Sequence, residues 1–188
     1  LSLRRQRQMC IRDSLNADIA LGEESSPWTP IGNETNRFKG TFNGENHVVS
    51  GLFISDSSGK NLGLFGYVEN GAVESLTVKG SVYGSGNVAG IVGYLSEGNV
   101  INCGNNADVT GSSAVAGVVG YVGGASSVSG CYNSGSVTGT TGYIGGVTGQ
   151  HWRAGSVENC YNTGVITGPA TVGGVSGVHK AVSYTHLR

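Results

Sequence analysis

A glycine-framed motif recurs five times along this chain at an almost constant interval. Its copies read NLGLFGY, NVAGIVGY, AVAGVVGY, YIGGVTGQ and TVGGVSGV. The glycines that close them are Gly66, Gly93, Gly120, Gly149 and Gly177, so successive copies lie 27, 27, 29 and 28 residues apart. A period of this length indicates a repeat architecture in which no single unit buries its apolar face alone.

A second motif lies between the copies of the first and aligns with itself in columns. Its copies AVESLTVKGSVYG, NVINCGNNADVTG, SVSGCYNSGSVTG and SVENCYNTGVITG begin at residues 72, 99, 127 and 156. If the units stack, each column becomes a ladder of equivalent side chains. We expect buried free thiols in one ladder and amides hydrogen-bonded along the stack in another. The thiol column is Cys103, Cys131 and Cys160, and the amide column is Asn105, Asn133 and Asn162.

The composition favours strands over helices. Glycine supplies 34 of 188 residues, and each glycine costs about 1 kcal/mol in a helix interior. Short runs of Val, Ile, Thr and Tyr between Gly and Asn read as strands, about three in each unit. Val157 and Cys160 are three residues apart, so a corner must lie between them, near Asn159. The closing glycines are expected at corners as well, where positive φ is needed.

These features predict an all-β fold, a right-handed parallel β-helix whose coils contain about 27–29 residues. A β-propeller is the alternative, but its blades need about 40–50 residues. Thr148 and Ser176 stand where earlier copies have Val92 and Val119. This drift to polar residues predicts a surface-facing column.

The chain divides into four segments by composition. Residues 1–14 and 182–188 do not match the rest and resemble translated sequencing-adapter sequence, so we expect them to be disordered and foreign to the fold. Residues 15–60 read as the N-terminal lead-in to the solenoid, and residues 61–181 as its repeats. Residues 15–181 hold six basic and eleven acidic residues, which leaves no basic patch for nucleic acid. No apolar run approaches the ~18 residues of a membrane helix, so no membrane insertion is expected.

These repeats resemble those of a known protein family. The units G-[IV]-V-G followed by V-x-N-C-Y-N-x-G-x-[VI]-T-G look like GLUG-motif repeats, and Trp28–Ile54 is similar to the segment that often precedes them. The resemblance implies part of a large bacterial surface or secreted protein. Adhesin-like proteins and the non-catalytic portion of immunoglobulin-A-cleaving metallopeptidases carry such repeats. It implies no catalytic residues within the repeat.

Metal and cofactor chemistry finds no support in the sequence. Neither C-x-x-C nor H-E-x-x-H occurs, so we expect no metal and no cofactor. Stacked parallel Cβ atoms stay ~4.8 Å apart, farther than the ~3.8 Å typical of a disulfide, so bridges along the ladder are not expected. His47, His151 and His179 are interpreted as surface or capping residues, with His151 in a loop.

Carboxylate pairs are the remaining catalytic candidates, because β-helices also host enzymes that cleave polysaccharides. Glu74 and Glu158 lie three coils apart, about 14 Å by strand spacing, whereas glycosidase pairs are roughly 5–9.5 Å apart. Glu69 and Glu97 lie one coil apart and could approach each other. A calcium site at that corner would lack converging oxygen ligands. The prediction is therefore that this segment is not an enzyme.

Aromatic residues provide the one indication of binding. Tyr67, Tyr94 and Tyr121 form a column after the closing glycine, which either covers the solenoid or binds sugars. Trp152 and Arg153 replace small residues in the segment Gln150–Ala154, interpreted as a variable loop, where binding usually resides.

The predicted function is a non-catalytic structural or adhesive region of a larger bacterial cell-surface or secreted protein, with a host glycan or protein as partner. Two alternatives stay open: an accessory domain of a secreted immunoglobulin-A-type metallopeptidase, and a carbohydrate-binding or polysaccharide-active β-helix. We expect a monomer apart from edge-to-edge stacking of uncovered coils.

Overall fold

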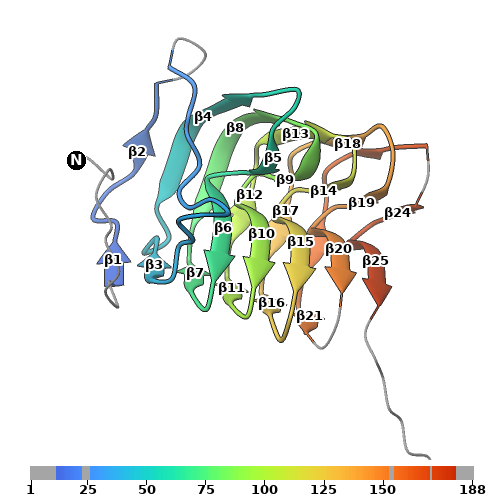
Figure 1. Cartoon of the computed structure of the whole chain (residues 1–188). Helices are drawn as coiled ribbons and strands as arrows, with labels where there is room; N and C mark the ends of the chain where they lie inside the picture. The colour runs from blue at the N-terminus through green and yellow to red at the C-terminus, as the bar shows by residue number, and fades with distance from the viewer. Residues whose placement is uncertain (1–11, 23–25, 153–154, 170, 181–188) are drawn as a thin grey trace, which may run out of the picture.

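The structure, a computed structural model, describes residues 12–22, 26–152, 155–169 and 171–180. Every regular element in these residues is a strand, and every pairing between strands is parallel. The strands stack into a continuous solenoid that runs from β1 to β25 (Figure 1). The predicted parallel β-helix is therefore confirmed. No helix in the described ranges has the length and hydropathy of a membrane span.

Four parallel sheets, named A to D, make up the solenoid, and each coil passes through them in the order D, C, A, B. Sheet A contains β1 (Arg12–Ser14), β3 (Thr41–Asn43), β7 (Ala72–Glu74), β11 (Asn99–Ile101), β16 (Ser127–Ser129) and β21 (Ser156–Glu158). Sheet B contains β2 (Ile19–Ala20), β4 (Val48–Ser55), β8 (Thr77–Tyr83), β12 (Gly104–Asn105), β13 (Asp108–Gly111), β17 (Tyr132–Asn133), β18 (Val137–Gly139), β22 (Tyr161–Asn162) and β23 (Ile166–Thr167). Sheet C contains β6 (Phe65–Glu69), β10 (Val92–Ser96), β15 (Val119–Gly123), β20 (Thr148–Trp152) and β25 (Ser176–Lys180). Sheet D contains β5 (Lys60–Leu62), β9 (Gly86–Ala89), β14 (Ala114–Ala116), β19 (Tyr143–Gly145) and β24 (Thr171–Gly173).

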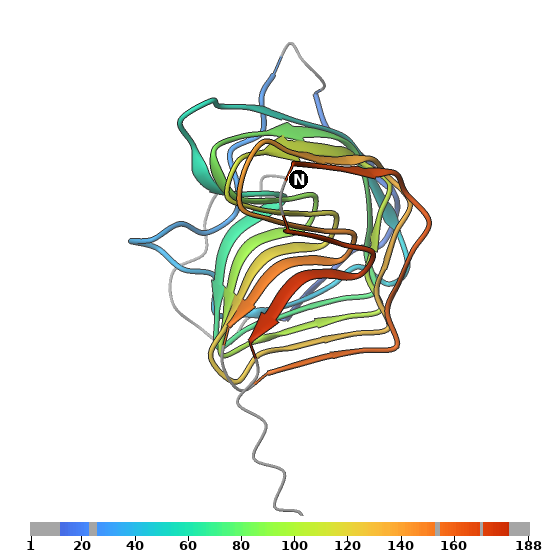
Figure 2. The same ribbon diagram turned by 90° about the vertical axis from the view of Figure 1, so that its right-hand side faces the viewer.

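The solenoid is right-handed. In Figure 2 the C-terminal coil faces the viewer, and the chain turns counterclockwise as it advances toward the viewer. The registers repeat the sequence period, since Phe65 pairs with Val92, Val92 with Val119, and Val119 with Thr148. The coils from β9 to β23 each contain five short strands where about three were expected, because sheet B takes two of them and sheets C and D are separate strands of the glycine-framed motif.

The corners are made mainly by residues with positive φ that are not glycine. The corner between sheets A and B has φ of 52° at Ser75, 53° at Asn102, 64° at Gly130 and 54° at Asn159. This confirms the corner predicted near Asn159. Asparagine tolerates the left-handed region because its short polar side chain bonds to the local backbone.

Sheet D runs inside the coil, between sheet C and the second half of sheet B (Figure 2). Its strand β14 is buried along its whole length, at Ala114, Val115 and Ala116. A Cβ added at Gly93 would lie 2.4 Å from the carbonyl carbon of Asn61 in β5, and one at Gly149 would lie 2.7 Å from the Val115 nitrogen. The closing glycines are therefore not corners, as expected, but strand residues that allow two backbones to approach closely.

Apolar columns from all four sheets fill the interior. The column Val68, Leu95, Val122 and His151 is in register in sheet C, and every member is 0 % exposed. His151 is thus a core residue and not part of a loop, because β20 extends through Trp152. The expectation of a surface-facing column at Thr148 is also wrong.

Thr148, Val92 and Val119 are all 0 % exposed, so that column points inward despite its polar member. In the last described coil, Val172 is 42 % and Val165 70 % exposed, since no further described coil packs on it.

The N-terminal segment closes the opposite end of the stack. Trp28 donates its indole N–H to the Leu64 carbonyl at 3.1 Å, and the Phe38 and Phe42 rings pack on Phe65 with centroids 5.1 and 5.3 Å away. Strand β1 pairs with β3, so Arg12–Ser14 lie in the stack although the sequence assigns them to a disordered arm. Parallel backbone pairing requires only an extended chain, whatever its side chains. The rest of that arm lies outside the described residues, as do residues 182–188.

Candidate functional site

The cysteine column is enclosed and its thiols are free. Cys103 and Cys131 are buried, and Cys160 is half-buried. The Cys131 thiol donates to the Ser129 carbonyl at 3.3 Å, and Cys103 donates to Ile101 in the same way. The hydrogen bond with the Cys103 thiol, together with burial, raises the pKa of Cys131 to about 12. Contact with Cys131 and burial also raise the pKa of Cys160. A thiol held neutral in this way is a poor nucleophile and a poor metal ligand.

The asparagine column forms a continuous hydrogen-bonded ladder through the core. Asn105 Nδ2 donates to Asn133 Oδ1 at 2.8 Å, and Asn133 Nδ2 donates to Asn162 Oδ1 at 2.7 Å. Each amide also donates to the carbonyl two residues onward, for example Asn133 to Gly135 at 2.8 Å. The ladder therefore satisfies buried polar groups and fixes the register between coils.

The tyrosine column is a stack of rings on sheet C. The centroids of Tyr67 and Tyr94 are 4.5 Å apart, and those of Tyr94 and Tyr121 are 4.6 Å apart, with the planes inclined by 17° and 18°. Arg37 lies over the remaining face of Tyr67, 4.8 Å from its centroid. Both faces of Tyr67 and of Tyr94 are thus covered, and only their edges and hydroxyl groups face outward. Burial and the neighbouring tyrosines raise the pKa of Tyr94 to about 12.

The expected Trp152 and Arg153 site is only partly described. Trp152 is half-buried at the end of β20 and pairs with Lys180 of β25 in sheet C. The tyrosine column ends at Tyr121 on β15, because its partner on β20 is Gln150, two residues before Trp152. Arg153 lies outside the described residues. Trp152 is therefore separated along the stack from Tyr67 and Tyr94.

A surface groove of about 500 Å³ opens beside the first two tyrosines. One wall is the loop at residues 33–37, which lies at the edge of the stack, and the other is the start of β5 and β9. Its lining residues are Glu34, Thr35, Arg37, Lys60, Asn61, Tyr67, Asn87 and Tyr94. Among these, the sequence analysis identified Tyr67 and Tyr94 only. For the other lining residues, the sequence offers one indication: asparagine begins the first two copies of the glycine-framed motif, at Asn61 and Asn87.

Hydrogen bonds order both walls of this groove. Asn87 Nδ2 donates to Asn61 Oδ1 at 2.8 Å, and Asn61 Nδ2 donates to Glu34 Oε1 at 3.2 Å. Asn33 Oδ1 accepts from the backbone of Thr35 at 2.9 Å and holds the loop in a tight turn. The groove is thus formed without a ligand, which lowers the entropic cost of binding.

Two cations neutralise Glu69 at the edge of this region. Lys39 Nζ lies 3.1 Å from Glu69 Oε2, and Arg37 forms a short ion pair with Glu69 Oε1. These hydrogen bonds, from Lys39 first and Arg37 second, lower the pKa of Glu69. Glu97 Oε2 accepts from the Ala125 backbone at 3.1 Å in the next coil. The Glu69 and Glu97 pair, the strongest catalytic candidate, is therefore committed to structural contacts.

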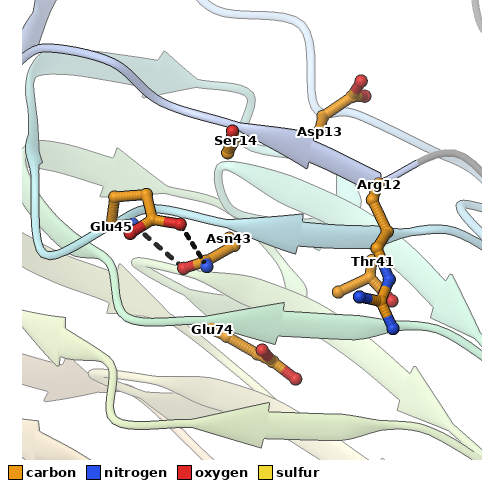
Figure 3. A pocket seen from close by; sticks show the side chains of 7 residues that line it. All are labelled: Arg12, Asp13, Ser14, Thr41, Asn43, Glu45 and Glu74. Atoms are coloured by element: carbon orange, nitrogen blue, oxygen red, sulfur yellow. Dashed lines mark hydrogen bonds between the residues drawn. The ribbon is translucent and has the colours of Figure 1, made fainter.

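A second cavity, of about 340 Å³, lies on sheet A near its N-terminal edge. Its three carboxylates do not converge (Figure 3). Glu45 is hydrogen-bonded to Asn43, Asp13 on β1 points away from the other lining side chains, and Glu74 lies on β7. This arrangement places no acid and base on either side of a bond to be cleaved.

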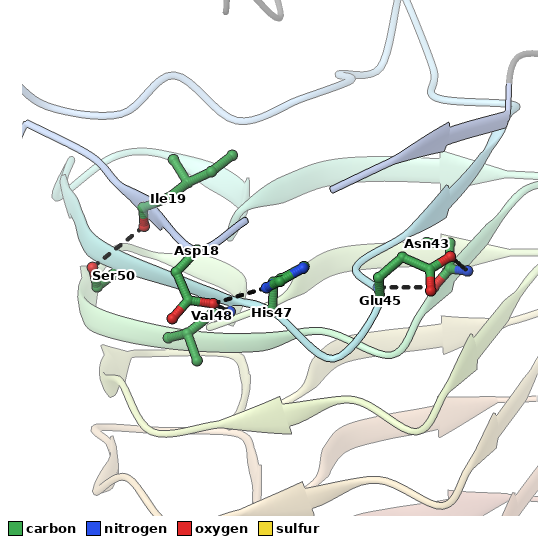
Figure 4. A network of polar contacts seen from close by, with 7 residues as sticks. All are labelled: Asp18, Ile19, Asn43, Glu45, His47, Val48 and Ser50. Carbon is green, nitrogen blue, oxygen red and sulfur yellow. Dashed lines mark hydrogen bonds and ion pairs between the residues drawn. The ribbon is translucent and has the colours of Figure 1, made fainter. Parts of the chain in front are cut away.

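The Asp18–His47 pair lies nearby on the surface. Asp18 Oδ1 is 3.1 Å from His47 Nδ1 and accepts from the Val48 backbone at 2.9 Å. The Val48 hydrogen bond, aided by His47, lowers the pKa of Asp18. Ser50 donates instead to the Ile19 carbonyl, on the side of Asp18 away from the imidazole (Figure 4). The three side chains therefore do not form a nucleophile–base–acid relay. Elsewhere among the described residues, no three His, Cys, Asp or Glu side chains gather as metal ligands would.

These observations define the class: a right-handed parallel β-solenoid of glycine-rich repeats. Residues 140–167 match the family model described as the GLUG motif. The chain therefore carries a GLUG repeat, and the resemblance seen in the sequence is confirmed.

Two similar proteins extend this comparison. A 54-residue stretch is 44% identical to a candidate Gly-rich membrane protein of Evansella cellulosilytica, and it covers 28% of this chain and 6% of that protein. This chain thus spans only a small part of that relative. A crystal structure of a candidate immunoglobulin A1 protease from Bacteroides ovatus has a TM-score of 0.62 and 20% identity, over 89% of this chain and 78% of that one. This likeness establishes the shared fold.

Proposed function

We propose that this chain is a non-catalytic structural repeat region of a larger bacterial protein, exposed at the cell surface or secreted, and that it displays an adhesive face. The observation that carries the proposal is the uninterrupted stack. Each coil adds the same parallel backbone pairing and about 4.8 Å of length, and three successive coils share the thiol and amide ladders. Such a stack is a rigid spacer whose outward columns are free to vary.

The location is tested with antibodies raised against the purified chain. Intact cells of the source bacterium, or their culture medium, should react before any permeabilisation. Reaction only after permeabilisation would place the protein inside the cell and overturn the proposal.

The adhesive face is tested by binding to arrays of host glycans and host surface proteins. We expect Trp152→Ala to lower binding, since Trp152 places a large, half-buried ring at the C-terminal end of β20 in sheet C. Tyr83→Ala is the matched control, because Tyr83 is an exposed ring on sheet B, 46 % accessible. Equal losses in both variants, or none in either, would remove the basis for an adhesive sheet C.

A second candidate is an accessory region of a secreted peptidase. It is favoured by the shared fold with the candidate immunoglobulin A1 protease. The carboxylates described above do not converge, so a catalytic centre would lie elsewhere in such a protein. Sequencing the gene on both sides of this segment tests it, since a peptidase requires a zinc-binding H-E-x-x-H helix.

A further inference from the structure

The groove between the loop at residues 33–37 and the first two tyrosines occurs once in the described stack. The column that begins sheet D holds Asn61 and Asn87 in the first two coils, then Ala114, Tyr143 and Thr171. Asparagine therefore occupies this column only where the loop lies beside it. A side-chain pattern that departs from its repeat beside an irregular loop marks a local site.

The groove presents both hydrogen-bond acceptors and hydroxyl groups that can donate. Asn87 uses its Nδ2 on Asn61, and among the described residues no hydrogen bond reaches its Oδ1, which leaves an acceptor facing the groove. Glu34 supplies carboxylate oxygens, while the phenol edges of Tyr67 and Tyr94 supply hydroxyl groups. A ligand with many hydroxyl groups can satisfy such a mixed set.

The rings act here through their edges. Tyr94 covers one face of Tyr67 and Arg37 covers the other, so a sugar cannot stack on that ring. The polar edges remain available, and they favour hydroxyl-to-hydroxyl contacts over apolar stacking.

One basic side chain of the groove, Lys60, forms no ion pair with the described residues. Arg37 is ion-paired with Glu69, which Lys39 shares. Lys60 is exposed at the start of β5, and within the described part of the chain no carboxylate lies within ion-pair distance of it. Lys60 can therefore pair with an anionic group of a ligand through a charged hydrogen bond.

We propose that this groove binds a short oligosaccharide that carries a carboxylate. The sugar hydroxyls bond to Asn87, Glu34 and the tyrosine edges, and the carboxylate pairs with Lys60. The volume of about 500 Å³ lies within the range of ligand pockets. This inference rests on the proposed display function and names its ligand class.

The test is titration of the folded chain with tetragalacturonate, and with the neutral cellotetraose, by isothermal calorimetry at physiological salt. We expect tetragalacturonate to bind and cellotetraose to bind at least about tenfold more weakly, a difference of about 1.4 kcal/mol. Lys60→Gln should weaken tetragalacturonate by about tenfold and leave cellotetraose unchanged. Lys79→Gln, an exposed lysine on β8 in sheet B, is the matched control and should change neither.

A second variant tests the amide without disturbing the backbone. Asn87 has φ of 53°, so Asn87→Gly removes the side chain and keeps the left-handed conformation. Asn102→Gly has the same φ of 53° at an exposed corner far from the groove and is its control. We expect weaker binding in Asn87→Gly alone.

Three results would overturn this inference: no binding of tetragalacturonate, equal binding of both saccharides, or equal affinity in Lys60→Gln and the unaltered chain. None of them bears on the adhesive role of sheet C, whose test uses Trp152 and cell-surface labelling. Conversely, a chain found only inside the cell would leave the groove able to bind a saccharide in vitro, so the two failures are distinguishable.

Discussion

Replacing Asn133 by alanine should destabilise the solenoid strongly, because this residue is the interior rung of the amide ladder. The Asn133 side chain accepts from Asn105 at 2.8 Å and donates to Asn162 at 2.7 Å and Gly135 at 2.8 Å, and it is 0 % exposed. Each bond contributes about 1 kcal/mol net, and partners left buried without a bond add about 1–3 kcal/mol. We expect the free energy of unfolding to fall by about 4 kcal/mol.

Asn162→Ala provides the comparison within the same ladder. Asn162 is half-buried and has a described ladder partner on one side only, Asn133, besides its own bonds to Gly164. Water can replace part of what is lost there, so the decrease should be about 1–2 kcal/mol. Urea unfolding followed by circular dichroism measures both. Equal losses at Asn133 and Asn162, or a loss under about 1 kcal/mol at Asn133, would refute the ladder argument.

Three further changes test other parts of the structure. Gly93→Ala should lower the free energy of unfolding by about 3 kcal/mol, because its Cβ would meet the backbone of Asn61 at 2.4 Å, whereas Gly86→Ala, with its nearest contact at 3.5 Å, should be almost neutral; thermal melts compare the two. The raised pKa of Tyr94, about 12 in the folded chain against 10.0 when unperturbed, means that the unfolded state ionises first, so stability should fall from about pH 10 to about pH 12. A Tyr94→Phe variant that keeps the full slope would contradict this. With its pKa near 12, Cys131 should resist iodoacetamide at neutral pH until the chain unfolds, as peptide mapping by mass spectrometry can determine.

Most of the fold prediction depended on the length of the repeat. A spacing of 27–29 residues, with β-branched runs between glycines, leaves few architectures other than a stacked coil, and the corner beside Asn159 follows from the three-residue step to Cys160. These inferences hold because alternation along a strand and equivalence between coils are local properties of the sequence.

The closing glycines show where local reasoning fails. A glycine that provides a positive φ and one that permits a close backbone approach look identical in a sequence. Gly93 and its equivalents are of the second kind, because sheet D folds inward and lies against them. His151 and Thr148 were misplaced for a related reason: a polar residue was taken as a sign of exposure, whereas the column to which it belongs decides its direction.

The groove could not be predicted because it depends on a contact across the stack. The loop at residues 33–37 has no repeat partner, and only the folded chain places it beside Tyr67 and Asn87. The sequence did identify the tyrosine column, but not that its ring faces are covered by one another and by Arg37.

In this solenoid, the inward columns of side chains maintain the fold, and the outward columns are free to carry function. An inward column packs against its equivalents in the neighbouring coils, so a change there affects the coils on both sides. An outward column has no such constraint, and a site confined to it can be gained or lost without unfolding the stack. The exposed Lys60, the outward edges of Tyr67 and Tyr94 and the neighbouring loop meet this condition at one end of the stack, while the ladders of Cys131 and Asn133 lie farther along it. If the groove binds as proposed, ligand choice is set by the few residues at which an irregular segment meets the repeat, and length is set independently by the number of coils.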